Sequence, residues 1–306
     1  MHGSLHTPTT MSSFSNPDSQ ARISTRLSLR WLPEVASETT DTLVLNVGEW
    51  YVDLRVDKKS GQIDWALAGQ YLQQNITQQM PDKGTQTTLS KRIAELTFGE
   101  EKKKTAYIVF THDIDSHYNF NVSAPCAFIQ QPNGDDLETG SMPRPDLPGE
   151  PVTDYEELWR YLPPRRGSEG QGRGCISYVL ESDDGVLGDG RHQLNKLFIA
   201  RIGGQYLVLQ QNVTHERRRI SRGKWTVQVT GGDVSARREE WVDGRWEARY
   251  VLGPRGDELP SMNGELGGVG RNSEIRSGDK VSFGGSQYIV RAYEDLRSNL
   301  HRTSRI

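Results

Sequence analysis

The sequence has few of the residues and patterns that mark disulfide-linked, membrane-spanning or nucleic-acid-binding proteins. Its 306 residues include two cysteines, Cys126 and Cys175, which are too few for a disulfide framework and too far apart for a Cys-x-x-Cys zinc site. The 37 basic and 40 acidic residues give a net charge of −3, so the chain lacks the basic excess that drives nucleic-acid binding. No apolar run is long enough for a membrane-spanning helix. The first residues lack the basic and apolar regions of a secretion signal, and we therefore expect a protein of the cytoplasm and nucleus.

The sequence also lacks a complete motif for the common catalytic sites. It has no Gly-x-Ser-x-Gly motif, and the glycine-rich stretch 264–270 has neither the GxGxxG spacing nor a following Lys-Ser/Thr pair. The segment from His112 to His117 contains imidazole and carboxylate groups of the kind that bind divalent metals. On a strand, these two histidines are five positions apart and face opposite sides, so a polar turn is the favoured interpretation. We therefore predict neither a metal ion nor a cofactor.

The main pattern in the sequence is a series of short segments in which apolar and polar residues alternate, separated by turn residues. Residues 50–56 alternate apolar and polar side chains after Gly48-Glu49, which is the pattern of a β-hairpin. Gly203-Gly204 and Asp243-Gly244 separate further alternating runs in the same way, because glycine adopts positive φ without steric cost. The pattern predicts an all-β protein, and two small antiparallel barrels fit the chain length.

One segment, Tyr155 to Leu162, is predicted to form a short helix. Tyr155 and Trp159 are four positions apart, and Pro163-Pro164 would end the helix. The stretch 131–152 is rich in proline and glycine, which places a domain boundary near residue 150. The predicted organisation has four parts: a disordered tail over 1–21, a barrel over 22–150, a short helix plus a second barrel over 151–296, and a tail over 297–306.

A strongly basic segment is the main candidate for contacts with a partner. It places five cations in eight residues, and it is predicted to be a loop between two strands. The segment is either a solvated loop or a contact for an acidic protein partner. Ser221 follows Arg-Arg-Ile, a form that basophilic kinases accept, so its phosphorylation would neutralise the segment. The five cations are Arg217, Arg218, Arg219, Arg222 and Lys224.

Tryptophans and carboxylates near the predicted first barrel are candidates for a ligand site. Small barrels can hold one apolar ligand among aromatic side chains and a few polar groups. Trp50 and Trp65 are the candidate ligand contacts, while Asp64 and Glu138 are the candidate acids. Core packing is the simpler explanation for most tryptophans of the chain.

Five segments, in order along the chain, resemble the fungal Hri-type protein family, which is named for association with a casein kinase I. The resemblance implies two calycin-like, lipocalin-related barrels and a protein partner, for which a casein kinase I is the candidate. It implies no reaction and no catalytic residue. The segments are Trp50-Tyr-Val-Asp-Leu-Arg55, Ser60-Gly61 followed by Ile63-Asp-Trp-Ala-Leu-Ala-Gly69, Leu137-Glu-Thr-Gly140, Tyr155-Glu-Glu-Leu-Trp-Arg160, and a terminal stretch with Gly278-Asp-Lys-Val281 and Tyr288-Ile-Val290.

Two functional hypotheses of different classes follow. The first is a non-enzymatic, kinase-associated adaptor that binds a protein partner, with a small apolar ligand as a further candidate. The alternative is a cofactor-free isomerase or cyclase that acts on an apolar metabolite inside a barrel, with Asp64 or Glu138 as the acid. A buried carboxyl with a raised pKa would favour the enzyme, whereas exposure of both carboxyls would favour the binding protein.

Overall fold

The protein is built from β-strands. The computed structural model describes residues 21–74, 107–169, 175–183, 191–221, 223–264, 275–283 and 285–295. Within these ranges the single helical element is the 3-10 turn η1, Gly256–Glu258, which confirms the all-β prediction. Residues 1–20 of the predicted first tail and the predicted tail over 297–306 lie outside the described ranges.

The first sheet closes into an eight-stranded antiparallel barrel. Its strands follow the order β3-β2-β1-β9-β8-β7-β5-β4, and pairing of β3 with β4 closes the ring. The short strand β6 pairs with β4 at one side. The strands are β1 Arg22–Trp31, β2 Thr40–Val47, β3 Trp50–Asp57, β4 Ile63–Gln74, β5 Tyr107–Phe110, β6 Ile114–Asp115, β7 Cys126–Gln130, β8 Asp136–Pro143 and β9 Val152–Leu162.

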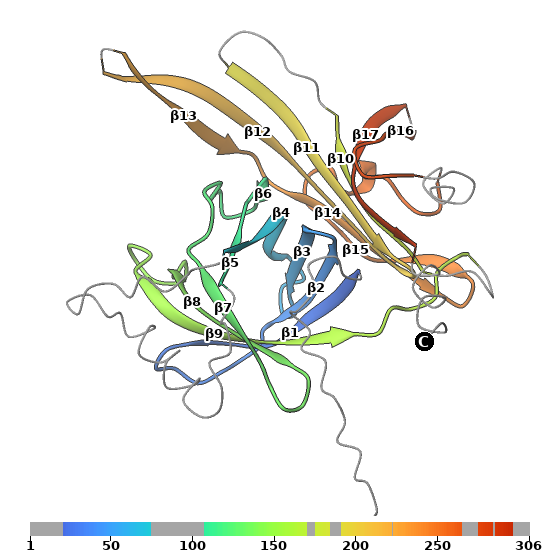
Figure 1. Ribbon diagram of the computed structural model, residues 1–306, viewed down its shortest axis with the longest axis horizontal. Coiled ribbons are helices and arrows are strands. Elements are labelled where there is room, and N and C mark those ends of the chain that lie inside the picture. Colours follow the sequence, from blue (N-terminus) through green and yellow to red (C-terminus); the bar gives the residue numbers. More distant parts are fainter. Residues whose placement is uncertain are drawn as a thin grey trace, which may run out of the picture.

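The second sheet is open. Its order is β15-β14-β12-β11-β10-β17-β16, with β13 paired to the outer part of β12 (Figure 1). Among the described residues the end strands β15 and β16 do not pair with each other, so a second barrel is not confirmed, and the calycin-like relation stays a prediction. The strands are β10 Ile176–Ser182, β11 Arg191–Ile202, β12 Gln205–Ser221, β13 Lys224–Gly231, β14 Ser235–Val242, β15 Arg245–Leu252, β16 Lys280–Phe283 and β17 Ser286–Asp295.

The predicted helix at 155–162 is wrong. These residues lie in β9, which pairs with β1 on one side and β8 on the other. A spacing of four brings Tyr155 and Trp159 to one face in a helix and also in a strand, so the spacing does not distinguish the two structures. Because β8 and β9 are neighbours in the barrel, the predicted boundary near residue 150 falls between two strands of the same sheet.

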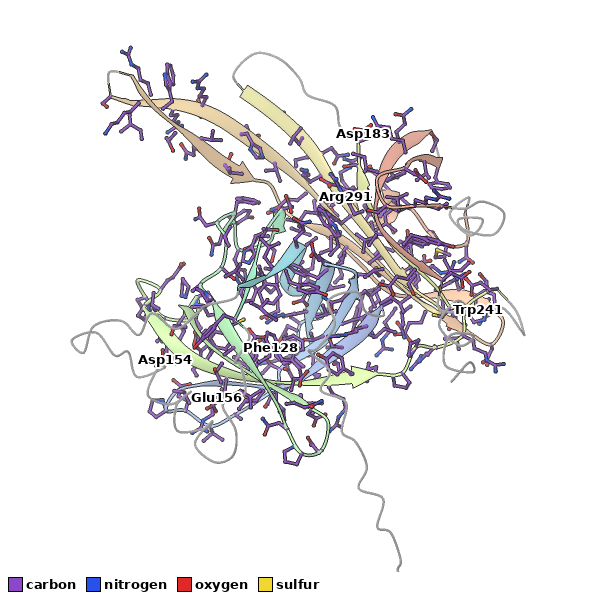
Figure 2. The ribbon with its side chains drawn as sticks, viewed as in Figure 1. Phe128, Asp154, Glu156, Asp183, Trp241 and Arg291 are labelled. Carbon is purple, nitrogen blue, oxygen red and sulfur yellow. The ribbon has the colours of Figure 1, made fainter. Side chains whose placement is uncertain are left out.

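The barrel and the second sheet share one apolar core. Successive side chains of a strand point to opposite faces, and in β2, β3 and β4 one set packs against the second sheet while the other faces the barrel interior. Trp50, at the start of β3, stacks on Phe198 of β11 with ring centroids 5.9 Å apart. Side chains fill the space between the two sheets (Figure 2). Barrel residues of this shared core include Leu43, Leu45, Val52, Leu54, Ala66 and Ala68, and those of the second sheet include Val179, Phe198, Ala200, Leu207, Leu209 and Ala236.

The other face of the second sheet has a separate core. Its residues include Tyr178, Tyr206 and Trp246. Leu259 and Met262, which come after η1 in the chain, also belong to this core and cover this face. Both faces of the central strands β10, β11 and β12 are therefore buried.

Phe198→Ala tests whether the shared core joins the two sheets. Phe198 is fully buried, so the substitution should lower the free energy of unfolding by about 3 to 5 kcal/mol. Urea unfolding followed by tryptophan fluorescence and by circular dichroism should still give one coincident transition. The control is Val227→Ala, at a 58% exposed side chain, which should change stability by less than about 0.5 kcal/mol. Two separate transitions would contradict a shared core.

Candidate functional site

The barrel interior carries a cluster of charged side chains. The alternation that turns Val52 and Leu54 toward the second sheet turns Tyr51, Asp53 and Arg55 the opposite way, into the barrel. Other strands add a further arginine and two glutamates to this interior. We call Arg26, Asp53, Arg55, Glu138 and Glu157 the interior cluster, and all five are buried.

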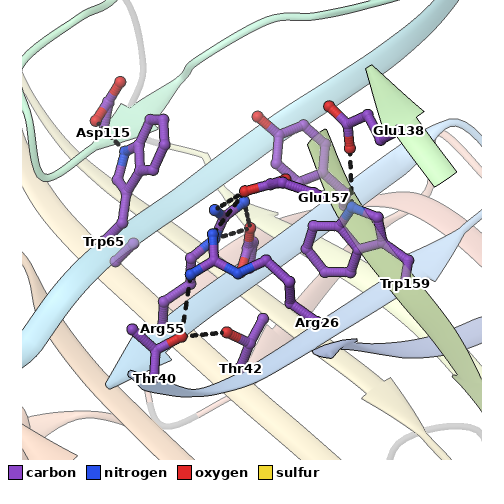
Figure 3. Close-up of polar contacts among 12 residues, drawn as sticks. Arg26, Thr40, Thr42, Arg55, Trp65, Asp115, Glu138, Glu157 and Trp159 are labelled. Carbon is purple, nitrogen blue, oxygen red and sulfur yellow. Dashed lines mark hydrogen bonds and ion pairs between the residues drawn. The ribbon is translucent and has the colours of Figure 1, made fainter. Parts of the chain in front are cut away.

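Arg55 lies at the centre of the interior cluster (Figure 3). Its Nε and Nη2 donate hydrogen bonds to Asp53 Oδ2 at 3.0 and 2.9 Å, and its Nη1 donates to Glu157 Oε1 at 3.1 Å. The guanidinium carbon is 4.9 Å from the ring centroid of Trp65 and 5.5 Å from that of Trp159, which is the geometry of cation–π contacts. One arginine thus joins two carboxylates and two indole rings.

Arg26 shares Glu157 with Arg55. Its Nη1 donates to Glu157 Oε1 at 2.6 Å, and its Nε donates to Glu38 Oε2 at 2.6 Å. Its Nη2 donates to Thr40 Oγ1 at 3.3 Å. Two cations bound to one buried carboxylate offset the desolvation of all three groups, because buried charges are tolerated where they are paired and hydrogen-bonded.

Two carboxyls of the interior cluster have raised pKa values. Burial raises the pKa of Asp53, and Arg55 opposes that shift. The Oδ1 atom of Asp53 has no hydrogen-bond partner within the described part of the chain. Burial and the negative charge of Glu157 raise the pKa of Glu138 to about 7, although a hydrogen bond from Tyr155 and the charge of Arg55 lower it.

Glu138 is held by two hydrogen bonds. Its Oε1 accepts from the Tyr155 hydroxyl at 2.6 Å, and its Oε2 accepts from Trp159 Nε1 at 3.0 Å. Cys126 lies near this carboxyl, and burial raises the pKa of its thiol well above the usual range, so the thiol is not activated as a nucleophile. The arrangement places a carboxyl of raised pKa inside a closed wall of strands.

A projecting β-hairpin is the second candidate site. Strand β12 pairs with β11 as far as Glu216, and beyond that residue it pairs with β13 alone. The hairpin extends past the rest of the second sheet, at the upper left of Figure 1. We call residues 217–221 and 224–227 the β-arm, and all of their side chains are exposed.

The two faces of the β-arm differ in chemistry. Residues directly opposite each other in an antiparallel pair share a face, so the pairs Arg217–Val227 and Arg219–Trp225 lie on one face. The Arg217 guanidinium carbon is 4.8 Å from the Trp225 ring centroid, while Trp225 and Val227 are 52% and 58% exposed. Arg218 lies on the other face.

On that other face, Arg218 is neutralised locally. Its Nη2 lies 3.0 Å from Glu216 Oε2 in an exposed ion pair. No ion pair of Arg217 or Arg219 occurs within the described ranges. The β-arm therefore has a basic and aromatic face, made by Arg217, Arg219, Trp225 and Val227, and an opposite face that carries the Arg218–Glu216 ion pair.

Comparison with known proteins places the chain in a family. The model of the family described as Protein HRI1 matches residues 22–290. The chain belongs to the HRI1 family. A solved structure with a similar fold is that of the uncharacterized protein YLR301w from Saccharomyces cerevisiae, at 15% identity and a TM-score of 0.54, covering 90% of this chain and 99% of the other. No curated protein matches the chain in sequence.

Membership of the HRI1 family confirms the resemblance found in the sequence. The match spans both sheets, and the similar solved structure supports the fold alone. Among the residues described, no helix has the length and apolar character needed to cross a membrane.

The four candidate ligand and acid residues do not form one site in this HRI1-family chain. Trp65 lies on the inner side of the barrel wall under Arg55, whereas Trp50 lies on the outer side, between Phe198 and Arg291. Glu138 is 6% exposed and belongs to the interior cluster, while Asp64 is exposed. The sequence identified Glu138 but missed its partners, because alternation alone does not show that the polar face of a strand lines a closed interior.

The histidine segment forms a polar turn beside β6. His112 Nδ1 is 2.9 Å from Asp115 Oδ2, and His117 stacks on Trp65 with ring centroids 4.7 Å apart. Asp115 Oδ1 accepts a hydrogen bond from Trp65 Nε1 at 2.9 Å. In the portion of the chain that the structure describes, no three His, Cys, Asp or Glu side chains come together as metal ligands.

The predicted basic loop is largely strand. Arg217, Arg218 and Arg219 end β12 and Lys224 begins β13, while Arg222 lies outside the described residues. Gly223, with φ +81°, supplies the backbone conformation that the turn between these strands requires. The sequence found the basic residues but did not show that they divide between two faces.

Arg55→Ala should strongly destabilise the protein. The variant leaves Asp53 buried with neither of its two hydrogen bonds from Arg55, and removing one partner of a buried ion pair costs about 3 to 5 kcal/mol. Thermal and urea unfolding measure the loss. Arg245→Ala, at an exposed ion pair with Glu247, is the control and should cost less than about 1 kcal/mol. Equal effects of the two substitutions would contradict a dependence on the interior cluster.

Glu138→Gln should change how stability depends on pH. The folded pKa is about 7 against an ordinary 4.5, so between these values the folded state holds a proton that the unfolded state releases. The wild-type free energy of unfolding therefore falls as pH rises from about 5 to about 7, by up to about 3 kcal/mol relative to the variant. Glutamine is able to accept from Trp159 and donate to Tyr155, so the variant mimics the protonated acid.

The measurement is urea unfolding at several pH values from 5 to 8, with Glu258→Gln as a control at an exposed carboxyl. Parallel curves for the wild type and Glu138→Gln would show that Glu138 titrates as an ordinary glutamate.

Proposed function

We propose that this protein is a non-enzymatic binding protein whose β-arm docks an acidic segment of a protein partner. The observation that carries the proposal is the basic and aromatic face, where two arginines that have no carboxylate partner among the described residues flank an exposed tryptophan. Tryptophan and arginine are the residues that most often dominate binding energy at protein interfaces.

Charge complementarity favours an acidic partner. The chain has a net charge of −3, so a local group of cations on a projecting arm is not a general property of its surface. Such a group steers an oppositely charged partner during encounter. Exposed Val227 and Trp225 add apolar surface that is buried when the partner docks.

The root of the β-arm is fixed to the barrel. Gln211, on β12, accepts a hydrogen bond from the Asp115 backbone N–H at 2.9 Å and donates to the Asp115 carbonyl at 2.9 Å. It also donates to the Gly232 carbonyl at 2.8 Å, which joins the root of β12 to the chain after β13. A rigid root lowers the entropy lost when the arm binds.

The kinase-associated adaptor role is part of this proposal. A casein kinase I is the partner to test first, because it is the partner that the family resemblance implies. An acidic peptide tests the proposed chemistry separately from that particular partner.

The isomerase or cyclase alternative has one observation in its favour. Glu138 is a buried carboxyl with a pKa of about 7, and perturbed carboxyls of this kind are common in active sites. Both of its oxygens are already held by Tyr155 and Trp159, and the surrounding interior is charged, which is unsuited to an apolar metabolite or apolar ligand. The alternative is therefore second to partner binding.

Charge reversal on each face of the β-arm tests the proposed function. Arg217→Glu and Arg219→Glu should each slow association with an acidic peptide and with a casein kinase I, by about tenfold at low salt. Arg218→Glu is the matched control, because Arg218 is equally basic in sequence but lies on the opposite face. Surface plasmon resonance measures the rates at several salt concentrations, and the differences should shrink as salt shortens the screening length.

Trp225→Ala should instead speed dissociation, because it removes apolar contact area from the same face. An equal effect of Arg218→Glu would contradict the assignment of one face. Tighter binding of a single-stranded RNA than of the acidic peptide would contradict a protein partner.

A further inference from the structure

The pattern Arg-Arg-x-Ser occurs twice in the chain, at 165–168 and at 218–221. Kinases that select basic substrates bind the two arginines through their own carboxylates and need the serine in an accessible, extended segment. By sequence alone, Ser168 and Ser221 are equally suitable substrates for such a kinase. Their surroundings in the structure differ.

Ser221 is open to a second protein. It is exposed and lies at the end of β12, in extended backbone opposite Lys224. Arg218 and Arg219, three and two positions before it, are also exposed. This part of the hairpin has two strands only, and an isolated two-stranded ribbon is marginally stable, so the tip can separate to enter a kinase cleft.

Ser168 lies in a segment that is fixed to the second sheet. Arg165 Nη1 is 3.0 Å from Glu240 Oε2, and its carbonyl accepts a hydrogen bond from Gly204 N–H at 3.0 Å. The Arg166 carbonyl oxygen lies so close to Gly204 that a Cβ there would be 2.4 Å away. Ser168 is half-buried. A kinase would have to detach this segment before it reached the serine.

We propose that Ser221 is a phosphorylation site for a basophilic serine kinase, and that Ser168 is not. In the reaction, Ser221 Oγ attacks the γ-phosphorus of ATP bound to the kinase. A new O–P bond forms, the bond to the ADP oxygen breaks, and the hydroxyl proton passes to a base of the kinase. The product places a phosphate opposite Lys224, at the tip of the β-arm.

Phosphorylation would change the charge of the β-arm. A phosphate carries about −1.5 to −2 charge near pH 7, which offsets nearly two of the five cations between 217 and 224. Lys224 lies directly opposite Ser221 in the strand pairing, so it is the cation placed to pair with the phosphate. The next step rests on the proposed function. The added negative charge weakens docking of an acidic partner, so phosphorylation of Ser221 switches partner binding off.

The first experiment tests the site alone. The folded full chain is incubated with Mg-ATP and the catalytic subunit of cAMP-dependent protein kinase, and phosphorylated residues are mapped by mass spectrometry. Ser221→Ala should lose nearly all incorporated phosphate, while Ser168→Ala should keep it. Synthetic peptides spanning each motif serve as controls, and both should be phosphorylated, because folding rather than sequence protects Ser168.

Three outcomes would overturn the proposal: equal labelling of Ser168 and Ser221 in the folded chain, labelling of the Ser221 peptide but not of folded Ser221, or labelling of neither. A second experiment measures association of the phosphorylated chain with the acidic peptide, which should slow relative to the unmodified chain. If Ser221 is labelled but the unmodified chain does not bind the peptide, the proposed function fails while the modification site stands.

Discussion

The guanidinium of Arg55 lies inside a closed wall of strands, where an unpaired charge would be strongly unfavourable. It is compensated by Asp53, two residues earlier on the same strand, and by Glu157 from β9, which is separated from β3 by two strands around the ring. Trp65 and Trp159 lie against its faces. Arg55 therefore connects strands that share no backbone hydrogen bond. The identity of the side chains that fill the barrel follows from this arrangement, because each charge brought inside requires a compensating partner beside it.

Much of the strand pattern was predictable from sequence, since alternation and glycine-containing turns are local signals. The segment 50–56 shows this well, because its alternation and the preceding Gly48 predicted β3 and its hairpin with β2. The sequence did not show whether a given face of a strand would lie in the interior or against solvent. Asp53 and Arg55 have the pattern of solvent-facing residues, and only closure of the ring turns them inward. The helix predicted at Tyr155–Leu162 was wrong for a related reason. Two residues four positions apart share a face in a helix and also in a strand, and only the pairing of this segment with β1 and β8 shows that it is a strand.

The molecule separates its charges into two populations. Arginines of the barrel interior are paired with carboxylates and restrained by indole rings, whereas Arg217 and Arg219 lie on an exposed arm beside an exposed tryptophan. Amino-acid composition does not distinguish the interior arginines from the exposed ones. The run of three consecutive arginines also gives no sign that the middle one, Arg218, is paired with Glu216. Strand register supplies that information. The candidate partner residues were thus found from sequence, but their division into a contact face and an opposite face required the pairing of β12 with β13.

Strand β3 is buried on both of its faces, with Val52, Leu54 and Val56 toward the second sheet and Tyr51, Asp53 and Arg55 toward the barrel interior. Insertion or deletion of a single residue within this strand would exchange the two sets, because the side-chain period of a strand is two. Two opposite charges would then enter an apolar core, and three aliphatic side chains would enter a charged interior. Length variation among relatives should therefore be absent from the middle of β3 and concentrated at its ends, where the turn at Gly48-Glu49 and the turn after Asp57 can absorb an added residue without reversing the faces.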